Sequence, residues 1–265
     1  MCNQLMSIAY QGLFDTHAHL NDSRFDEDRE EVLREMEEAG MLNLCVGADM
    51  ERSRTGIELA EKHPGLYAAV GVHPHDAKSF KETDPAQLAQ WLSHPKVVAL
   101  GEIGLDYYYD LSPREVQREV FIRQLHLAHE LDVPVILHIR DAHGDAIAIM
   151  QEQGADLPRC IVHCSSASWE STKIYLNMGC MISYAGPVTF KKSLKRQEAA
   201  RQVPEDRLLI ETDSPYLAPE PVRGRRNDPR NVQHICRFLA ELRGVTPEHL
   251  CARTRENGMR FFGLQ

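Results

Sequence analysis

The sequence lacks a long apolar run and lacks an excess of positive charge. None of the apolar stretches in its 265 residues approaches the roughly 18 residues that cross a bilayer, so no membrane span is expected. The 30 basic and 39 acidic side chains give a formal net charge of −9. That charge excludes a protein that coats nucleic acid by neutralising many phosphates. It permits an enzyme that binds one or two phosphates locally, especially beside bound divalent metals.

Signals for a disulfide framework are also missing. The seven cysteines are an odd number, and no two of them form a CxxC pair. Most have apolar neighbours, as in Leu44-Cys45-Val46, which is typical of reduced, buried thiols in a cytosolic protein. The first residues contain neither a basic segment nor a long apolar segment. We therefore expect no signal peptide. Together with the reduced cysteines, this favours a cytoplasmic location. We also expect no obligate protein partner.

A regular alternation of strand and helix signals fills the chain without long linkers. Eight short apolar runs alternate with longer segments of helical periodicity, which predicts a parallel sheet with right-handed crossovers. Eight strands close a (β/α)8 TIM-type barrel, and an open doubly wound sheet is the alternative. We predict an α/β fold with one barrel domain over residues 1–265, including an N-terminal extension over 1–11. The predicted strands are Leu13–Phe14, Leu42–Val46, Tyr67–Val72, Val97–Leu100, Pro134–Leu137, Cys160–Val162, Cys180–Ser183 and Leu208–Ile210, and a terminal helix is predicted over Pro247–Phe261.

Six of the eight predicted strands are followed by His, Asp or Glu. In a barrel these strand ends converge on one face, where the active site lies. His17 and His19 are two residues apart, so their side chains project to the same side of a strand. Four imidazoles and two carboxylates are too many for one four-coordinate ion and suit two metals that share a carboxylate. The predicted metal ligands are His17, His19, Glu102, His138, His163 and Asp213.

The segments that hold these residues follow one another through nearly the whole chain. They are FDTHAHLN (14–21), GVHPH (71–75), GEIGLDYYYD (101–110), ILHIRDA (136–142), VHCSS (162–166) and ETDSPYLAP (211–219). In composition and order they resemble the motifs of the TatD family of metal-dependent deoxyribonucleases, which belongs to the wider group of amidohydrolase-like barrels. The resemblance implies a TIM-type barrel with one or two divalent metals. It also implies hydrolysis of phosphodiester bonds in DNA, commonly as a 3′→5′ exonuclease.

The resemblance also implies a role for each predicted ligand. His17, His19, Glu102 and Asp213 would hold one metal, and Glu102 would bridge to a second metal held by the two remaining histidines, His138 and His163. Two segments depart from the family pattern. The HxHLD signature ends in Asn21, and the HCFSGS signature lacks its aromatic residue and its glycine over residues 163–168. We expect an altered shape for the loop after the sixth strand.

Two metals about 3.5–4 Å apart can hold a hydroxide that attacks phosphorus in line with the leaving sugar oxygen. Beside the bridging Glu102, we expect Asp213 to orient the water and take its proton. Glu211 would either support a metal ligand without contacting the metal itself or act as a secondary base. His73 would face the site and donate a hydrogen bond to the phosphate. The alternative interpretation is that His73 is a solvated histidine in a loop.

Several residues near the strand ends are candidates for contact with the substrate. Tyr107 begins a run of three tyrosines and could stack on a nucleobase, or could pack under a loop. Arg140 follows the fifth strand and could bind a phosphate or pair with a nearby aspartate. Arg223 and Arg225 lie in a basic run after the eighth strand that could guide a DNA backbone, or could pair with neighbouring glutamates.

The same donor set also suits other reactions and other metals. An amidohydrolase, a lactonase or an aminoacyl-ester deacylase would use the same bridging hydroxide on a small amide or ester. A non-catalytic interaction protein is a third class, and the presence of all six predicted ligands weighs against it. Imidazole-rich ligation suits Zn²⁺, Mn²⁺ or Ni²⁺, whereas Mg²⁺ prefers oxygen ligands. The family resemblance nevertheless implies that two Mg²⁺ ions support hydrolysis of DNA, with single strands or 3′ ends as the substrate.

Overall fold

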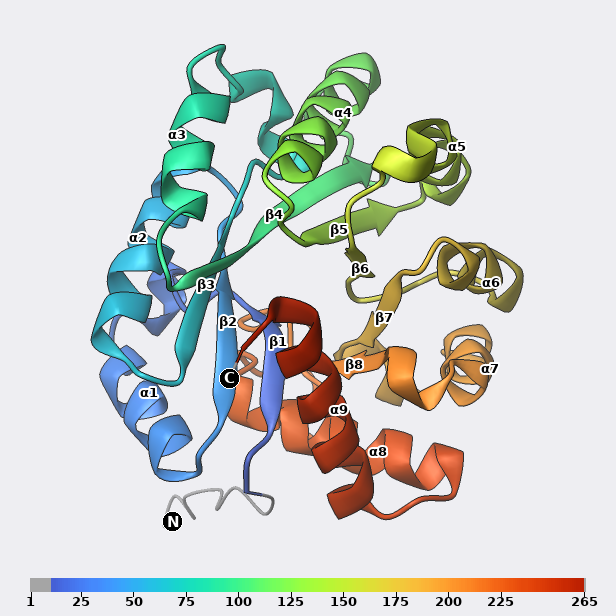
Figure 1. The fold of residues 1–265 in the computed structure, drawn as a ribbon. Helices are drawn as coiled ribbons and strands as arrows, with labels where there is room; N and C mark the ends of the chain where they lie inside the picture. Colours follow the sequence, from blue (N-terminus) through green and yellow to red (C-terminus); the bar gives the residue numbers. More distant parts are fainter. Residues whose placement is uncertain (1–10, 265) are drawn as a thin grey trace.

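Eight parallel strands form one sheet in the sequential order β1 to β8, and helices surround it (Figure 1). The computed structural model describes residues 11–264, so the predicted extension over 1–11 lies outside the described residues except for Gln11. The predicted single (β/α)8 barrel is confirmed. The strands are β1 Phe14–Ala18, β2 Leu42–Val46, β3 Leu66–Val70, β4 Val97–Asp106, β5 Val135–Arg140, β6 Cys160–Val162, β7 Met181–Tyr184 and β8 Leu208–Ile210.

The sheet closes between β1 and the segment that follows β8. The backbone N–H of Asp213 donates to the carbonyl of His17 at 2.9 Å, and the N–H of His19 donates to the carbonyl of Ser214 at 2.7 Å. Behind this seam, the buried carboxylate of Asp15 accepts hydrogen bonds from the backbone N–H and the hydroxyl of Thr212 at 2.8 and 2.6 Å. Closure of the barrel therefore brings the first motif, around His17, into contact with the last one, around Asp213.

Nine α-helices are present in residues 11–264, and none is long and apolar enough to span a membrane. The terminal helix α9 lies beside β1 and β8 (Figure 1), close to where the sequence predicts it. The helices are α1 Arg29–Glu38, α2 Met50–Lys62, α3 Asp84–Leu92, α4 Arg114–Glu130, α5 His143–Gln153, α6 Trp169–Asn177, α7 Leu194–Gln202, α8 Val232–Arg243 and α9 Pro247–Phe262.

Three strands continue at least three residues beyond the apolar runs that predict them. The prediction ends the first strand at Phe14 and the fourth at Leu100, whereas β1 continues through His17 and β4 continues to Asp106. Likewise, β5 runs on to Arg140. The ladder hydrogen bonds with the neighbouring strands continue there, although the side chains change from apolar to polar. The candidate site residues on these strands are therefore held by regular sheet.

Local irregularities in two strands lie next to candidate ligands. The pairing register of β1 with β2 shifts between Asp15 and Ala18, and that of β4 with β5 shifts between Leu100 and Ile103. Such irregularities re-aim side chains and are frequent beside active sites. They flank His17 and Glu102, respectively.

The core has two layers. One fills the space between the strands and the outer helices, and the other fills the barrel interior. The second layer continues into α9, whose Phe262 ring lies 5.9 Å from the ring of Phe14, centroid to centroid. A packed interior of this kind leaves room for chemistry only at the face where the strands end.

We expect Phe14→Ala to destabilise the protein, because Phe14 is fully buried between the barrel interior and α9. Removing such a ring costs about 3–5 kcal/mol in free energy of unfolding. Urea unfolding followed by circular dichroism measures the change. Leu131→Ala, at an exposed leucine after α4, is the control and should change the free energy by less than about 0.5 kcal/mol. Equal small effects of the two variants would contradict this account of the core.

Candidate metal centre

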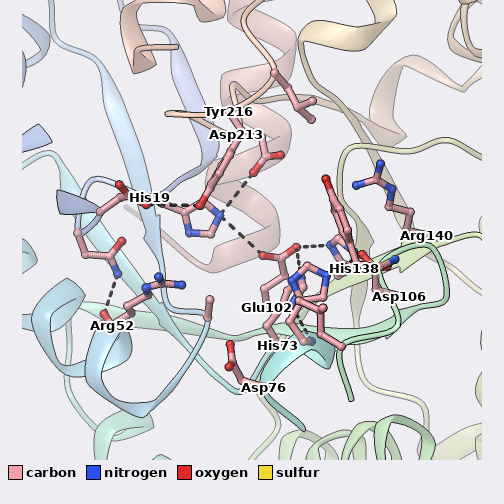
Figure 2. A pocket seen from close by; sticks show the side chains of 17 residues that line it. His19, Arg52, His73, Asp76, Glu102, Asp106, His138, Arg140, Asp213 and Tyr216 are labelled. Carbon is pink, nitrogen blue, oxygen red and sulfur yellow. Dashed lines mark hydrogen bonds and ion pairs between the residues drawn. The ribbon is translucent and has the colours of Figure 1, made fainter. Parts of the chain in front are cut away.

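The predicted ligands converge at one end of the barrel. His17 and His19 come from β1 and the residue after it, Glu102 from β4 and His138 from β5. The remaining two predicted ligands, His163 and Asp213, follow β6 and β8. Figure 2 shows Glu102 between Asp213 and His19 on one side and His138 on the other. The structure therefore brings together six residues that span almost 200 positions of the chain.

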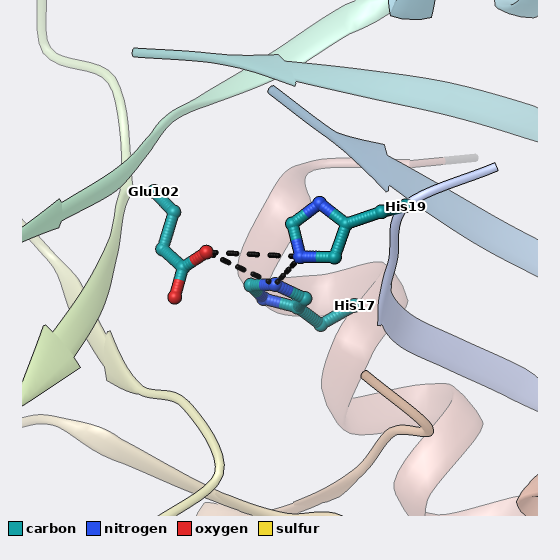
Figure 3. A group of neighbouring side chains, drawn as sticks. All are labelled: His17, His19 and Glu102. Carbon is teal, nitrogen blue, oxygen red and sulfur yellow. Dashed lines mark hydrogen bonds and ion pairs between the residues drawn. The ribbon is translucent and has the colours of Figure 1, made fainter. Parts of the chain in front are cut away.

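Four donor atoms surround one point on the β1 side of Glu102, and Figure 3 shows three of the side chains that carry them, His17, His19 and Glu102. Nε2 of His17 and Nε2 of His19 are 3.3 Å apart. Oε2 of Glu102 lies 3.5 and 3.8 Å from these two nitrogens, and Oδ1 of Asp213 lies 3.7 and 3.4 Å from them. Donors about 2.0–2.2 Å from one tetrahedral ion would be separated by about 3.3–3.6 Å. The four side chains fit a divalent metal.

The second carboxylate oxygen of Glu102 faces three more imidazoles. Oε1 lies 2.6 Å from Nδ1 of His138, 2.9 Å from Nε2 of His163 and 3.6 Å from Nε2 of His73. One carboxylate thus connects two groups of nitrogen donors. This is the arrangement that a bridging ligand between two metals requires.

The groups behind each imidazole set its protonation. Nδ1 of His19 must carry a proton because it lies 3.0 Å from the carbonyl oxygen of Val46, which only accepts, and this leaves Nε2 free to ligate. Nδ1 of His73 instead accepts the backbone N–H of His75 at 3.1 Å, so the proton of neutral His73 is on Nε2. His19 therefore offers a lone pair to the centre, whereas His73 offers an N–H.

Electrostatics keeps the central carboxylates ionised. Burial alone would raise the pKa of Glu102, but the neighbouring imidazoles, His163 above all, outweigh it and hold that pKa well below its usual value. Asp213 follows the same pattern: burial opposes ionisation, yet the hydrogen bond to His19 and the neighbouring imidazoles lower its pKa. Burial and the neighbouring His138 lower the pKa of His73 well below its ordinary value, so His73 is neutral.

Glu211 lies directly behind His163. Its Oε1 accepts hydrogen bonds from Nδ1 of His163 at 2.9 Å and from the backbone N–H of Cys164 at 2.6 Å. Glu211 is almost completely buried and does not line the cleft. Together, Glu102 and Glu211 raise the pKa of His163 well above its ordinary value, although burial opposes this. The geometry makes Glu211 a positioning residue for this imidazole.

Asp106 plays the same part behind His138, and the sequence interpretation did not include it among the site residues. Its Oδ2 lies 2.9 Å from Nε2 of His138 and 3.0 Å from Nε2 of His75. Burial would raise the pKa of Asp106, but hydrogen bonds from His138, His75 and the Tyr109 backbone lower it. A sequence signal existed: Asp106 follows Glu102 by four residues, and period-two alternation puts both on one side of a strand.

The centre opens into a cleft of about 410 Å³. His73 and Arg140, two of the predicted site residues, line it together with Glu102 and Asp213. Arg140 follows His138 by two residues on β5, which explains why both side chains reach the same face. The guanidinium of Arg140 stacks over the rings of Tyr108 and Tyr109, at 4.0 and 4.8 Å from their centroids.

Three other predicted substrate contacts lie outside the lining of this cleft. Tyr107 donates its hydroxyl to Asp145 at 2.8 Å. Arg223 stacks over the ring of Phe190 at 4.1 Å, and Arg225 is exposed on the same segment after β8. Contact of these three residues with a substrate stays a prediction. Tyr109, rather than Tyr107, is the member of the tyrosine run that lines the cleft.

The fold and the buried donor cluster define the class of the protein: a metal-dependent hydrolase built on a (β/α)8 barrel. The chain belongs to the TatD related DNase family, whose model matches residues 14–263.

Individual relatives and a solved structure agree with this assignment. The chain is 43% identical over 253 residues to the uncharacterized metal-dependent hydrolase YabD of Bacillus subtilis, covering 95% of this chain and 99% of that protein. It is 34% identical to the 3'-5' ssDNA/RNA exonuclease TatD of Cronobacter sakazakii, covering 94% and 97%. The crystal structure of YJJV, a TatD homologue from Escherichia coli K12, superposes with a TM-score of 0.89 at 31% identity, covering 96% and 98%.

We expect Glu211→Gln to weaken binding of divalent metal, because the uncharged amide stabilises the orientation of His163 less well. Losing such a partner behind a ligating histidine costs about 10- to 100-fold in metal affinity. Titration of metal-free protein with Zn²⁺ or Mn²⁺ by calorimetry measures the Kd. Asp76→Asn removes one charge from the lining of the same cleft without touching a ligand and is the control. An equal loss in both variants would show that only general electrostatics is involved.

Proposed function

We propose that the protein hydrolyses phosphodiester bonds at the 3′ end of single-stranded DNA, with two divalent metal ions, as a 3′→5′ exonuclease. Its family and the name of the Cronobacter relative, a 3'-5' ssDNA/RNA exonuclease, support this substrate. The observation that carries the proposal is Arg140. Its guanidinium lines a cleft rich in carboxylates, yet it makes no ion pair with any described residue and instead stacks on two tyrosines. An unpaired arginine beside the metal ligands is suited to an anionic phosphate.

The donor set supports a place for each metal. His17, His19, Glu102 and Asp213 would hold one ion, and Glu102, His138 and His163 would hold the other. Such ions supply Lewis-acid polarisation of a phosphoryl oxygen and a water of lowered pKa. The number of imidazoles suits Zn²⁺, Mn²⁺ or Ni²⁺ in the site, and the family supports Mg²⁺ as the ion that sustains hydrolysis.

The chain's own residues then orient the substrate and move a proton. His73 presents its Nε2–H near Oε1 of Glu102 and donates to a phosphate oxygen. Asp213 borders both the donor cluster and the cleft, so its carboxylate can accept a proton from attacking water. Arg140 binds a phosphate oxygen and holds the strand in register.

The direct test is hydrolysis of labelled single strands. Protein stripped of metal and reloaded with Mg²⁺, Mn²⁺ or Zn²⁺ singly is incubated with 3′-end-labelled and with 5′-end-labelled DNA. We expect rapid release of the 3′ label and a ladder of shortened 5′-labelled strands, both metal-dependent and both absent in Glu102→Gln. A parallel panel of small amides, esters and aminoacyl esters covers the alternative chemistry. Hydrolysis confined to that panel would overturn the proposal.

We expect Arg140→Ala to raise KM for single-stranded DNA about 10- to 100-fold, because a charge-assisted hydrogen bond to phosphate is lost. Steady-state kinetics on the 5′-labelled strand measures KM and kcat separately. The control is Arg54→Ala, which removes an exposed arginine of α2 that pairs with Glu58 on the same helix. Unchanged KM in Arg140→Ala would show that this guanidinium does not hold the strand.

A further inference from the structure

Exposed large apolar side chains gather at the mouth of the cleft. Four of the eight that occur in residues 11–264 line the cleft, and a fifth, Tyr108, packs on one of these four. Aromatic and apolar groups concentrated around a polar centre mark a binding surface. The four that line the cleft are Tyr109, Leu111, Tyr216 and Leu217, and the other three exposed ones are Leu131, Leu194 and Val245.

The first wall is built on the loop after β4. Tyr108 and Tyr109 are 58% and 54% exposed, and their rings meet edge to face at 4.9 Å. Their backbone N–H groups donate to Oδ1 of Asp106 at 3.0 and 2.8 Å. Tyr109 also packs edge to face on His75 at 5.4 Å, and Arg140 lies over both tyrosine rings. Both exposed rings therefore make defined contacts with neighbouring side chains.

The second wall is built on the segment after β8 and repeats the same pattern. Tyr216 and Leu217 are 42% and 41% exposed. The Tyr216 ring packs edge to face on His19 at 5.9 Å, and the guanidinium of Arg24 lies over it at 4.1 Å. Figure 2 shows Tyr216 and His19 on one side of Glu102 and Arg140 with Asp106 on the other. Each wall thus consists of an exposed tyrosine, an arginine over the ring and a histidine at its edge.

The aromatic rings and arginines of the two walls suit an unpaired nucleic-acid strand as ligand. Every nucleobase has a flat face that can stack on an aromatic ring, so stacking does not depend on the sequence of the strand. Bases in a duplex are already stacked and paired, so only an unpaired strand can offer its faces to side chains. Arg140, which has no ion partner among the described residues, adds the positive charge that a strand's phosphates require.

We propose that Tyr109 and Tyr216 form a two-sided clamp, in which each ring stacks on one unpaired nucleobase of a nucleic-acid end lying across Glu102. This inference rests on the proposed phosphodiesterase function and names what selects its substrate. The clamp recognises base faces, so it accepts any sequence and rejects strands that lack bases. The metal centre acts on the phosphodiester backbone between the walls. The two tyrosines select the strands whose backbone reaches that centre.

Binding in the absence of turnover tests the clamp separately from hydrolysis. The metal-loaded full chain is titrated by anisotropy into two fluorescein-labelled strands whose phosphates are phosphorothioates, which resist hydrolysis. One is a ten-residue oligothymidylate, and the other is an abasic strand with the same phosphates. We expect the oligothymidylate to bind about 100-fold more tightly, because each ring contributes about tenfold.

The variants assign this preference to the two rings. Tyr109→Ala and Tyr216→Ala should each weaken binding of oligothymidylate about tenfold and leave the abasic strand unchanged. Tyr109→Phe and Tyr216→Phe keep the ring and should restore tight binding. Leu131→Ala, at an exposed leucine outside the cleft, is the control for loss of exposed apolar surface. Circular dichroism verifies that each variant is folded.

The outcomes separate the clamp from the proposed function. If the metal-loaded wild type digests DNA but binds both strands equally, the clamp is overturned and the exonuclease function stands. Equal binding in the Ala and Phe variants also overturns the clamp. If the wild type neither binds nor digests any strand, both proposals fail. A base preference that falls about tenfold with the loss of either ring and returns with phenylalanine supports the clamp.

Discussion

A single buried carboxylate, that of Glu102, is the group on which the site depends. Its two oxygens face different sets of donors: His17 and His19 with Asp213 on one side, and His138 with His163 on the other. Such a charge cannot be buried without partners, because desolvation alone would neutralise it. The imidazoles from β1, β5 and the end of β6 therefore have to converge on β4, and only a closed barrel brings these strands to one point.

Support for this centre extends outward in layers. Behind His138 is Asp106, and behind His163 is Glu211, so each imidazole is fixed between an inner and an outer carboxylate. Asp106 also anchors the Tyr108 and Tyr109 backbone, which couples the rim of the cleft to its centre. A change in the position of this one aspartate would therefore disturb both a predicted metal ligand and the rim of the cleft.

Much of this arrangement was predictable from local pattern. Alternating strand and helix signals predict the barrel, and polar residues at strand ends predict the centre, because both depend on spacing of two residues in strands and on the rule that parallel strands end together. The prediction included Glu102 but omitted Asp106 from the site, although both lie on β4, which continues six residues beyond Leu100. It chose Tyr107 for stacking because three adjacent tyrosines look alike in sequence.

The sequence by itself determined the fold class and the chemical nature of the donors, because periodicity and residue type are local properties. Tertiary structure alone decided which atoms meet. It set His73 as an N–H donor and His19 as a lone-pair donor, since the backbone groups behind them come from packing and not from sequence spacing. It also turned Tyr109 toward the cleft and Tyr107 toward Asp145, because the loop after β4 winds around the Asp106 carboxylate. Contacts between residues far apart in the chain exist only once the barrel has closed.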